Sequence, residues 1–83
     1  MFSLNKWVVK GNVMDVIKNQ KGYWITVKGV AKNPSAFNSD CFRIKCWISK
    51  KVLGDKKIMK QISLTGSFQF KNKDCYLVAD NVD

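Results

Sequence analysis

The stretch GYWITVKGVAK (residues 22–32) alternates apolar and polar side chains with the two-residue period of a β-strand. One face, which we assign to the core, carries Tyr23, Ile25, Val27 and Gly29. The other face carries Trp24, Thr26, Lys28, Val30 and Lys32. Trp24 is the largest apolar side chain of the strand, yet it shares its face with lysines, which belong in water. The pattern predicts a strand whose outer face has a use besides solvation.

The stretch CFRIKCWIS (residues 41–49) alternates in the same strict way. Its core face carries Phe42, Ile44, Cys46 and Ile48, and its outer face carries Arg43, Lys45, Trp47 and Ser49. If it pairs with residues 23–32 as a hairpin, two tryptophans, an arginine and several lysines lie on one surface. A slip of one residue would bury both tryptophans and expose Ile25 and Ile44. We therefore expect the register that keeps the indole rings outside.

Three more segments have strand character, which brings the predicted total to five. They are residues 5–18, 61–70 and 75–82. Residues 19–22 and 71–74 are predicted turns, and residues 33–40 form the loop richest in residues that break regular structure. Gly11 lies inside the first strand, where a glycine predicts a bulge or a sharp bend. Because the apolar residues change faces beyond it, we expect this strand to serve two sheets.

Residues 50–60 are the least strand-like segment and have room for one short helical turn, which Gly54 would interrupt. Short strands separated by turns at this spacing favour a small barrel or sandwich. A closed barrel also removes the exposed edges of an open five-stranded sheet. We predict a small all-β barrel with at most one short helical turn between the third and fourth strands. The 83 residues allow a single domain, residues 1–83.

The charge of the chain is strongly basic, because fifteen Lys and Arg residues against six Asp residues give a net charge of +9. An excess of this size favours a polyanionic partner, first nucleic acid and second an anionic membrane surface. The alternative is an inert lysine-rich surface that keeps the protein soluble. We find no stretch suited to a signal peptide or a membrane span. The sequence predicts a cytoplasmic protein with no membrane partner.

Little in the sequence favours catalysis or metal binding. It has no histidine, and Cys41, Cys46 and Cys75 lack the spacing of a zinc site. We expect reduced, mostly buried thiols. Since glutamate is absent too, general acid–base chemistry has few candidate residues, so we predict neither an enzyme nor a cofactor. Oligomerisation often supplements a core this small, which leaves a homodimer as an open alternative.

The end of the chain resembles a known family. SLTGSFQFKNKDCYLVADNVD (residues 63–83) is similar to the close of bacterial single-stranded-DNA-binding proteins, and FRIKCWISKKVL (residues 42–53) resembles their third strand. In length the chain is similar to the small primosomal PriB-type proteins. The resemblance covers nearly the whole chain as a pattern. It implies a five-stranded OB-fold that binds single-stranded DNA on its second and third strands.

The outer face combines the groups that single-stranded nucleic acid requires. Aromatic rings stack on bases of any sequence, at about 1–3 kcal/mol per base, and lysines neutralise phosphates with release of counterions. The residues predicted to stack are Trp24 and Trp47, and those predicted to contact phosphates are Lys28, Arg43 and Lys45. Further predicted binding residues are Thr26, Lys32, Phe37 and Tyr76.

Several aromatic side chains have alternative explanations. Trp24 and Trp47 could pack under the neighbouring loop or in a dimer interface, where tryptophan is also favoured. Phe37 could fold back onto the barrel, and Trp7 fits the core and the surface equally. The aromatic side chains predicted to lie in the core are Phe68 and Phe70.

The sequence thus predicts a barrel that binds single-stranded DNA with little sequence preference. The expected role is accessory to replication or recombination, of a cell, a phage or another mobile element, alongside replication proteins. Two alternatives from other classes stay open. One is an RNA-binding barrel, which competition between DNA and RNA would distinguish. The other is a protein-interaction module, such as a viral inhibitor of a host factor, which would bind random oligonucleotides weakly.

Overall fold

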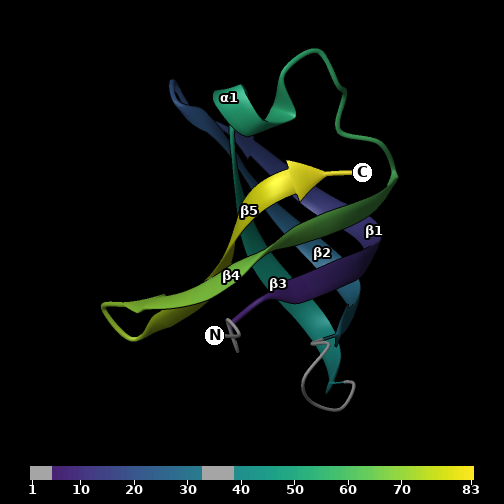
Figure 1. Cartoon of the computed structure of the whole chain (residues 1–83), viewed down its shortest axis with the longest axis vertical. Coiled ribbons are helices and arrows are strands. Elements are labelled where there is room, and N and C mark those ends of the chain that lie inside the picture. Colours follow the sequence, from purple (N-terminus) through teal and green to yellow (C-terminus); the bar gives the residue numbers. More distant parts are fainter. Residues whose placement is uncertain (1–4, 33–38) are drawn as a thin grey trace.

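Five strands and one short helix make up the computed structural model, which describes residues 5–32 and 39–83 (Figure 1). In chain order the elements are β1 (Trp7–Lys18), β2 (Gly22–Lys32), β3 (Ser39–Ser49), α1 (Lys50–Leu53), β4 (Gln61–Lys71) and β5 (Asp74–Val82). The strands close into a barrel in the order β1-β2-β3-β5-β4, and β4 pairs back onto β1. Neighbouring strands are antiparallel except β3 and β5, which are parallel. This arrangement confirms the predicted small all-β, OB-like barrel.

The barrel interior is filled from one side of each strand, because alternate residues point inward. The inward faces predicted for β2 and β3 are confirmed at Ile25, Val27, Ile44, Cys46 and Ile48, whose side chains are buried. The side chain of Phe42, predicted for the same face, lies outside the described part of the structure. Buried apolar residues of the other elements and of the end of β2 are Val9, Ala31, Leu53, Ile62, Leu64, Leu77, Ala79 and Val82. Tyr23 packs against this core and is half-buried. The predicted β2–β3 hairpin is confirmed as well, since Ile25 pairs with Cys46.

β1 pairs with a strand on each of its edges, but the predicted change of its apolar face does not produce a second buried face, because Met14 and Val16 are exposed. It pairs with β2 over residues 8–18 and with β4 over residues 7–12. The bulge predicted at Gly11 lies elsewhere, because the β1–β2 register shifts between Val13 and Asp15. That part of the prediction is wrong in position, and Gly11 has another function in the strand.

Gly11 is required by a close approach between strands. It pairs with Gly29 of β2 and with Ile62 of β4. A Cβ atom on Gly11 would lie 2.2 Å from the carbonyl oxygen of Lys28, and one on Gly29 would lie 1.9 Å from that of Lys10. No side chain fits at such distances. The two facing glycines therefore let β1 and β2 approach closely where the barrel curves.

α1 is the single helical turn predicted for residues 50–60. The hydroxyl of Ser49 accepts a hydrogen bond from the backbone N–H of Val52 at 3.2 Å, which caps the start of the turn. Gly54 ends it with a φ of 59°, a value that favours glycine. Buried Leu53 attaches the turn to one end of the barrel (Figure 1). Within the described residues, no helix has the length and apolar character needed to cross a membrane.

β4 and β5 form a hairpin that extends beyond the barrel wall (Figure 1). Its two-residue turn, Asn72 and Lys73, has φ values of 52° and 69°, as a type I′ turn requires. This confirms the turn predicted at residues 71–74. Phe68 is half-buried against the core, as predicted, but Phe70 is 81% exposed. The assignment of Phe70 to the core is wrong, because this residue lies in the part of the hairpin that extends beyond the barrel.

Trp7, for which core and surface were equal alternatives, is half-buried. Its ring meets that of Phe68 edge to face, with ring centroids 5.3 Å apart, and both pack against the core. The side-chain amide of Asn5 donates to the carbonyl oxygen of Phe68 at 2.8 Å, and its oxygen accepts from the Phe68 N–H at 2.9 Å. Trp7 thus belongs to the packing between β1 and β4 and not to the outer face of β2 and β3.

Candidate functional site

A row of large side chains crosses the outer face of the barrel. Trp24 of β2 lies directly opposite Trp47 of β3. Trp24 also pairs with Ile17 of β1, and Trp47 pairs with Val78 of β5. Paired residues of neighbouring strands point to the same face. The shared outer face predicted for the second and third strands is therefore present, and it extends onto β1 and β5.

Three aromatic rings on this face form one contact group, which we call the aromatic cluster: Trp24, Trp47 and Tyr76. The Trp24 ring centroid lies 5.0 Å from that of Trp47, with 49° between the planes, and 5.1 Å from that of Tyr76, at 78°. Aromatic pairs at such separations stabilise one another by about 0.5–1.5 kcal/mol. All three side chains are half-buried, so each ring keeps part of its surface accessible. Three strands, β2, β3 and β5, hold the cluster in place.

Lys45 covers one side of the Trp24 ring. Its ammonium nitrogen lies 4.8 Å from the ring centroid, a cation–π contact worth about 0.5–1 kcal/mol at an exposed site. Thr26 lies opposite Lys45 in the β2–β3 register and completes this part of the face. Because the contact is weak and the lysine stem is flexible, the ammonium group can exchange the ring for an anion nearby.

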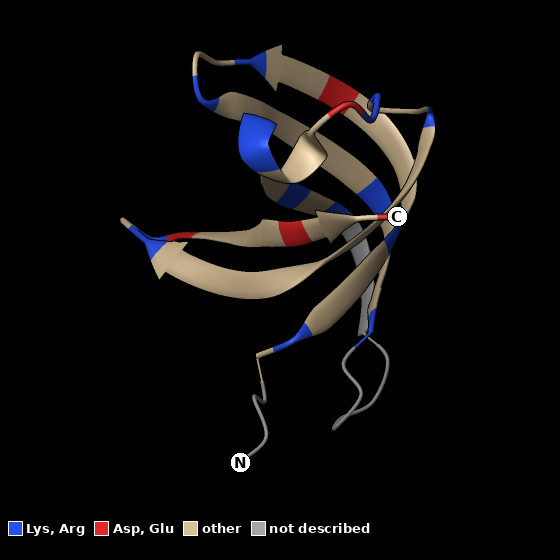
Figure 2. Cartoon of the chain, turned by 45° about the horizontal axis from the view of Figure 1, so that its top comes forward, with Lys and Arg blue, Asp and Glu red and all other residues tan. Residues whose placement is uncertain are grey.

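The other predicted basic residues, Lys28, Lys32 and Arg43, are exposed on the same two strands, and Figure 2 shows basic positions along both. Among the described residues, an ion pair forms between Lys6 and Asp80, at 2.7 Å. The cations of the outer face are therefore not neutralised by any described carboxylate. No carboxylate of the described side chains competes with an anionic ligand for them.

A shallow pocket of about 200 Å³ opens beside the aromatic cluster. It is lined by Trp24, Lys45, Lys71, Asn72, Asp74 and Tyr76. The β4–β5 hairpin supplies one wall, and β2 and β3 supply the other. Sequence reasoning considered Lys71 as an extension of the positive path but missed Asn72 and Asp74 of the hairpin wall, because the pairing of β3 with β5 joins segments far apart in the chain. The tight turn at residues 71–74 was the available signal.

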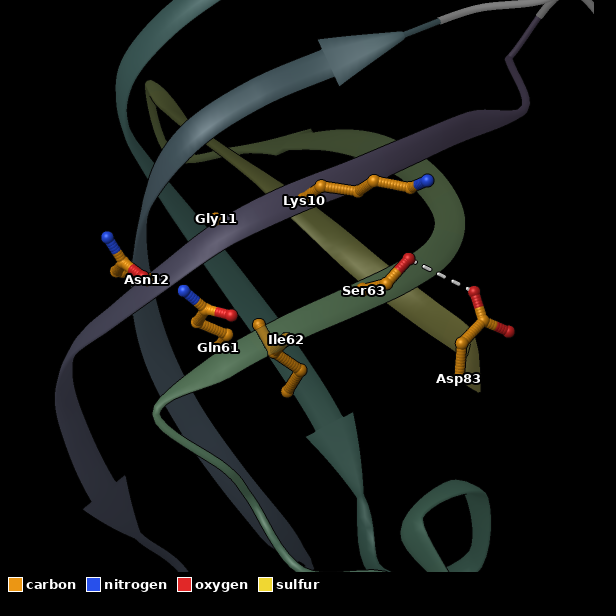
Figure 3. A pocket seen from close by; sticks show the side chains of 7 residues that line it. All are labelled: Lys10, Gly11, Asn12, Gln61, Ile62, Ser63 and Asp83. Atoms are coloured by element: carbon orange, nitrogen blue, oxygen red, sulfur yellow. Dashed lines mark hydrogen bonds between the residues drawn. The ribbon is translucent and has the colours of Figure 1, made fainter.

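Another pocket, of about 410 Å³, lies between β1 and β4 (Figure 3). It is lined by Lys10, Gly11, Asn12, Gln61, Ile62, Ser63 and Asp83. The hydroxyl of Ser63 donates to the Asp83 carboxylate at 3.1 Å. This pocket has no aromatic ring among its lining residues. The aromatic cluster is therefore the stronger candidate for a binding site.

The cysteines differ in their surroundings. Cys46 is fully buried, and burial raises the pKa of its thiol to about 12, so the thiol is protonated and unreactive at neutral pH. Cys75 is exposed on the hairpin, so the expectation of a buried thiol holds for Cys46 and is wrong for Cys75. The described side chains contain no group of three His, Cys, Asp or Glu that could hold a metal ion. Phe37 and the side chain of Cys41 lie outside the described part of the structure.

Comparisons of the chain with protein-family models, with curated proteins and with solved structures found no match. The class of protein is therefore defined by its fold and its face: a small OB-like barrel with an aromatic cluster beside exposed cations. Because one fold can carry many different ligands, the function has to be argued from the face itself.

Proposed function

We propose that the protein binds single-stranded DNA on the outer face of β2, β3 and β5, with little sequence preference. The observation that carries the proposal is the contact group of Trp24, Trp47 and Tyr76, half-buried outside the closed barrel and next to Lys45. Unpaired bases have flat apolar faces that stack on such rings, at about 1–3 kcal/mol per base. Packing in the barrel interior does not account for these rings, because they lie on the outer face.

The architecture supports the same ligand. OB-fold barrels bind oligonucleotides on the face of their second and third strands and with the loops that flank it. Here the aromatic cluster occupies that face, and the turn between β4 and β5 adds Lys71 and Asn72 to the neighbouring pocket. A bound strand would therefore meet rings on the barrel wall and a cation at the hairpin.

Lys45 has two partners in this mechanism. In the free protein its ammonium group rests on the Trp24 ring. When a base stacks on Trp24, Lys45 leaves the ring and contacts a phosphate of the same strand. The lost cation–π contact of about 0.5–1 kcal/mol is offset by stacking and by counterion release. Lys28 and Arg43 continue the phosphate path along β2 and β3.

Tryptophan fluorescence during titration with oligothymidylate, repeated across a salt series, tests the proposal. Stacking should quench Trp24 and Trp47, and the logarithm of the affinity should fall linearly with the logarithm of the salt concentration. A variant with both Trp24→Ala and Trp47→Ala should lose most of its affinity. Trp7→Phe, which changes a ring of the barrel packing, should retain it. Normal binding by the double variant would place the ligand on another face.

Competition between DNA and RNA oligonucleotides of equal sequence tests the choice of DNA, because only RNA offers the 2′-hydroxyl. A preference for RNA would change the ligand and leave the face unchanged. We further propose a non-enzymatic, cytoplasmic role accessory to replication or recombination, of a cell or of a mobile element. The protein would protect single strands and present them to replication proteins. A binder with little sequence preference suits this role because it accepts any exposed strand.

A further inference from the structure

The pocket beside the aromatic cluster contains a group that a general binder of single strands does not need. Asp74 is a carboxylate on a surface proposed to hold phosphates, and it lines the pocket together with Asn72 and Tyr76. A carboxylate repels phosphate, so Asp74 opposes the attraction that Lys45 and Lys71 exert at the same place. A ligand group that donates hydrogen bonds would instead be attracted to Asp74.

An internal partner does not explain Asp74. The residue lies opposite Lys71 in the β4–β5 register. Among the described residues, however, the ion pair is between Lys6 and Asp80, and Asp74 forms none with Lys71. The described carboxylates that accept hydrogen bonds belong to Asp15, Asp80 and Asp83. Within the described part of the chain, the Asp74 carboxylate thus keeps its full capacity to accept hydrogen bonds from a ligand.

We infer that this pocket is a single-base subsite that favours guanine, whose edge donates hydrogen bonds to Asp74. The inference rests on the proposed function. The Watson–Crick edge of guanine presents two adjacent donors, N1–H and N2–H, which match the two oxygens of a carboxylate. Adenine and cytosine present an amino group next to an acceptor nitrogen, and thymine presents one donor between two acceptors. A carboxylate therefore accepts guanine better than any other base.

The remaining pocket residues complete the subsite. The rings of Trp24 and Tyr76, edge to face with centroids 5.1 Å apart, offer an apolar surface on which the base can stack. The side-chain amide of Asn72 can donate to the guanine O6 atom, and Lys45 and Lys71 stand beside the pocket for the adjoining phosphates. A volume of about 200 Å³ has room for one base and not for a run of bases.

The test compares the affinity for oligothymidylate with that for the same oligomer carrying one central guanine. A bidentate base contact discriminates by a factor of at least about five, and we expect a preference of about five- to tenfold at this open site. Inosine at the same position keeps N1–H and lacks the N2 amino group. Most of the preference should therefore be lost with inosine. Equal affinities for the thymine and guanine oligomers would overturn the inference.

Asp74→Asn tests the assignment to this residue. The variant has the same size but one acceptor oxygen in place of two, so its guanine preference should disappear. Its affinity for oligothymidylate should rise, because a negative charge leaves the phosphate path. Asp55→Asn is the matched control, since it removes the same charge from the exposed connector after α1 and should keep the preference.

A guanine preference that survives in Asp74→Asn would also overturn the inference. Neither of these negative results affects the proposed function, because binding of oligothymidylate requires no guanine. The proposed function fails separately, if oligothymidylate does not bind or if the Trp24→Ala and Trp47→Ala double variant binds it normally.

Discussion

Gly11 of β1 lies directly opposite Gly29 of β2, and a side chain on either would collide with the backbone of the other strand. The nearest atoms to the two added Cβ positions are carbonyl oxygens, at 2.2 and 1.9 Å. Backbone held in a sheet cannot move aside as the end of a flexible side chain can. The packing of β1 on β2 therefore depends on a facing pair of residues without side chains.

Gly11→Ala should lower the free energy of unfolding by about 1–3 kcal/mol, the usual effect of inserting an atom where no space exists. Chemical denaturation measures the change. Asn12→Ala, at the exposed neighbouring position, should stay within about 0.5 kcal/mol of the wild type. If the Gly11→Ala variant were as stable as the wild type, β1 and β2 would have to be further apart at this position than the 2.2 Å contact implies.

Phe68 and Phe70 are two residues apart and therefore lie on the same face of β4, but Phe68 is half-buried and Phe70 is exposed. Phe68→Ala removes a ring packed on the core and on Trp7, so the free energy of unfolding should fall by about 1–3 kcal/mol. Phe70→Ala removes a ring that is 81% exposed and should change it by less than about 0.5 kcal/mol. Urea denaturation of both variants checks the difference. Equal losses would mean that the outer part of the hairpin is packed after all.

Lys45→Ala should weaken DNA binding in a way that depends on salt. The loss of one phosphate contact should reduce the slope of log affinity against log salt by about one. Lys57→Ala removes an equal charge from the exposed connector between α1 and β4 and should leave the slope unchanged. Binding titrations at several salt concentrations give both slopes. An unchanged slope in Lys45→Ala would rule out its contact with phosphate.

We expect the buried thiol of Cys46 to lower the free energy of unfolding at alkaline pH. Burial raises the pKa of its thiol from 9.0 to about 12, so the folded protein keeps a proton that the unfolded chain releases. The stabilisation is complete below about pH 9 and is lost as the pH rises towards about 12. In that range the wild type should lose up to about 1.4 kcal/mol per pH unit more than Cys46→Val. Denaturation curves recorded at a series of pH values test this, and parallel losses in the two proteins would contradict it.

The faces of β2 and β3 could be predicted from the sequence because the two strands form a hairpin. Strict alternation assigns each side chain to a face, and neighbours in the chain become neighbours in space. This places Trp24 and Trp47 together without any knowledge of the other strands. Alternation also predicted Tyr76 as a binding residue, but its contact with Trp24 could not be predicted, because that contact depends on the parallel pairing of β3 with β5.

Two further features show the limit of local patterns. Alternation predicts the face of β4 on which Phe70 lies. It does not predict that this part of the strand extends beyond the barrel, where no core covers the ring. A glycine inside a strand indicates either a bulge or a close approach. For Gly11 the distance to the neighbouring strand decides, since an added Cβ atom would lie 2.2 Å from the carbonyl oxygen of Lys28.

β3 and β5 are joined through two residue pairs, Cys46 with Leu77 and Trp47 with Val78, the shortest seam among the described strands. The Trp24–Tyr76 contact bridges this seam from outside, since one ring stands on β2 and the other on β5. A DNA strand stacked on both rings would link β2 to β5 across the pairing that has the fewest residue pairs. Occupied protein should then exchange its β3 and β5 amide hydrogens more slowly than free protein, so that ligand binding tightens the barrel itself.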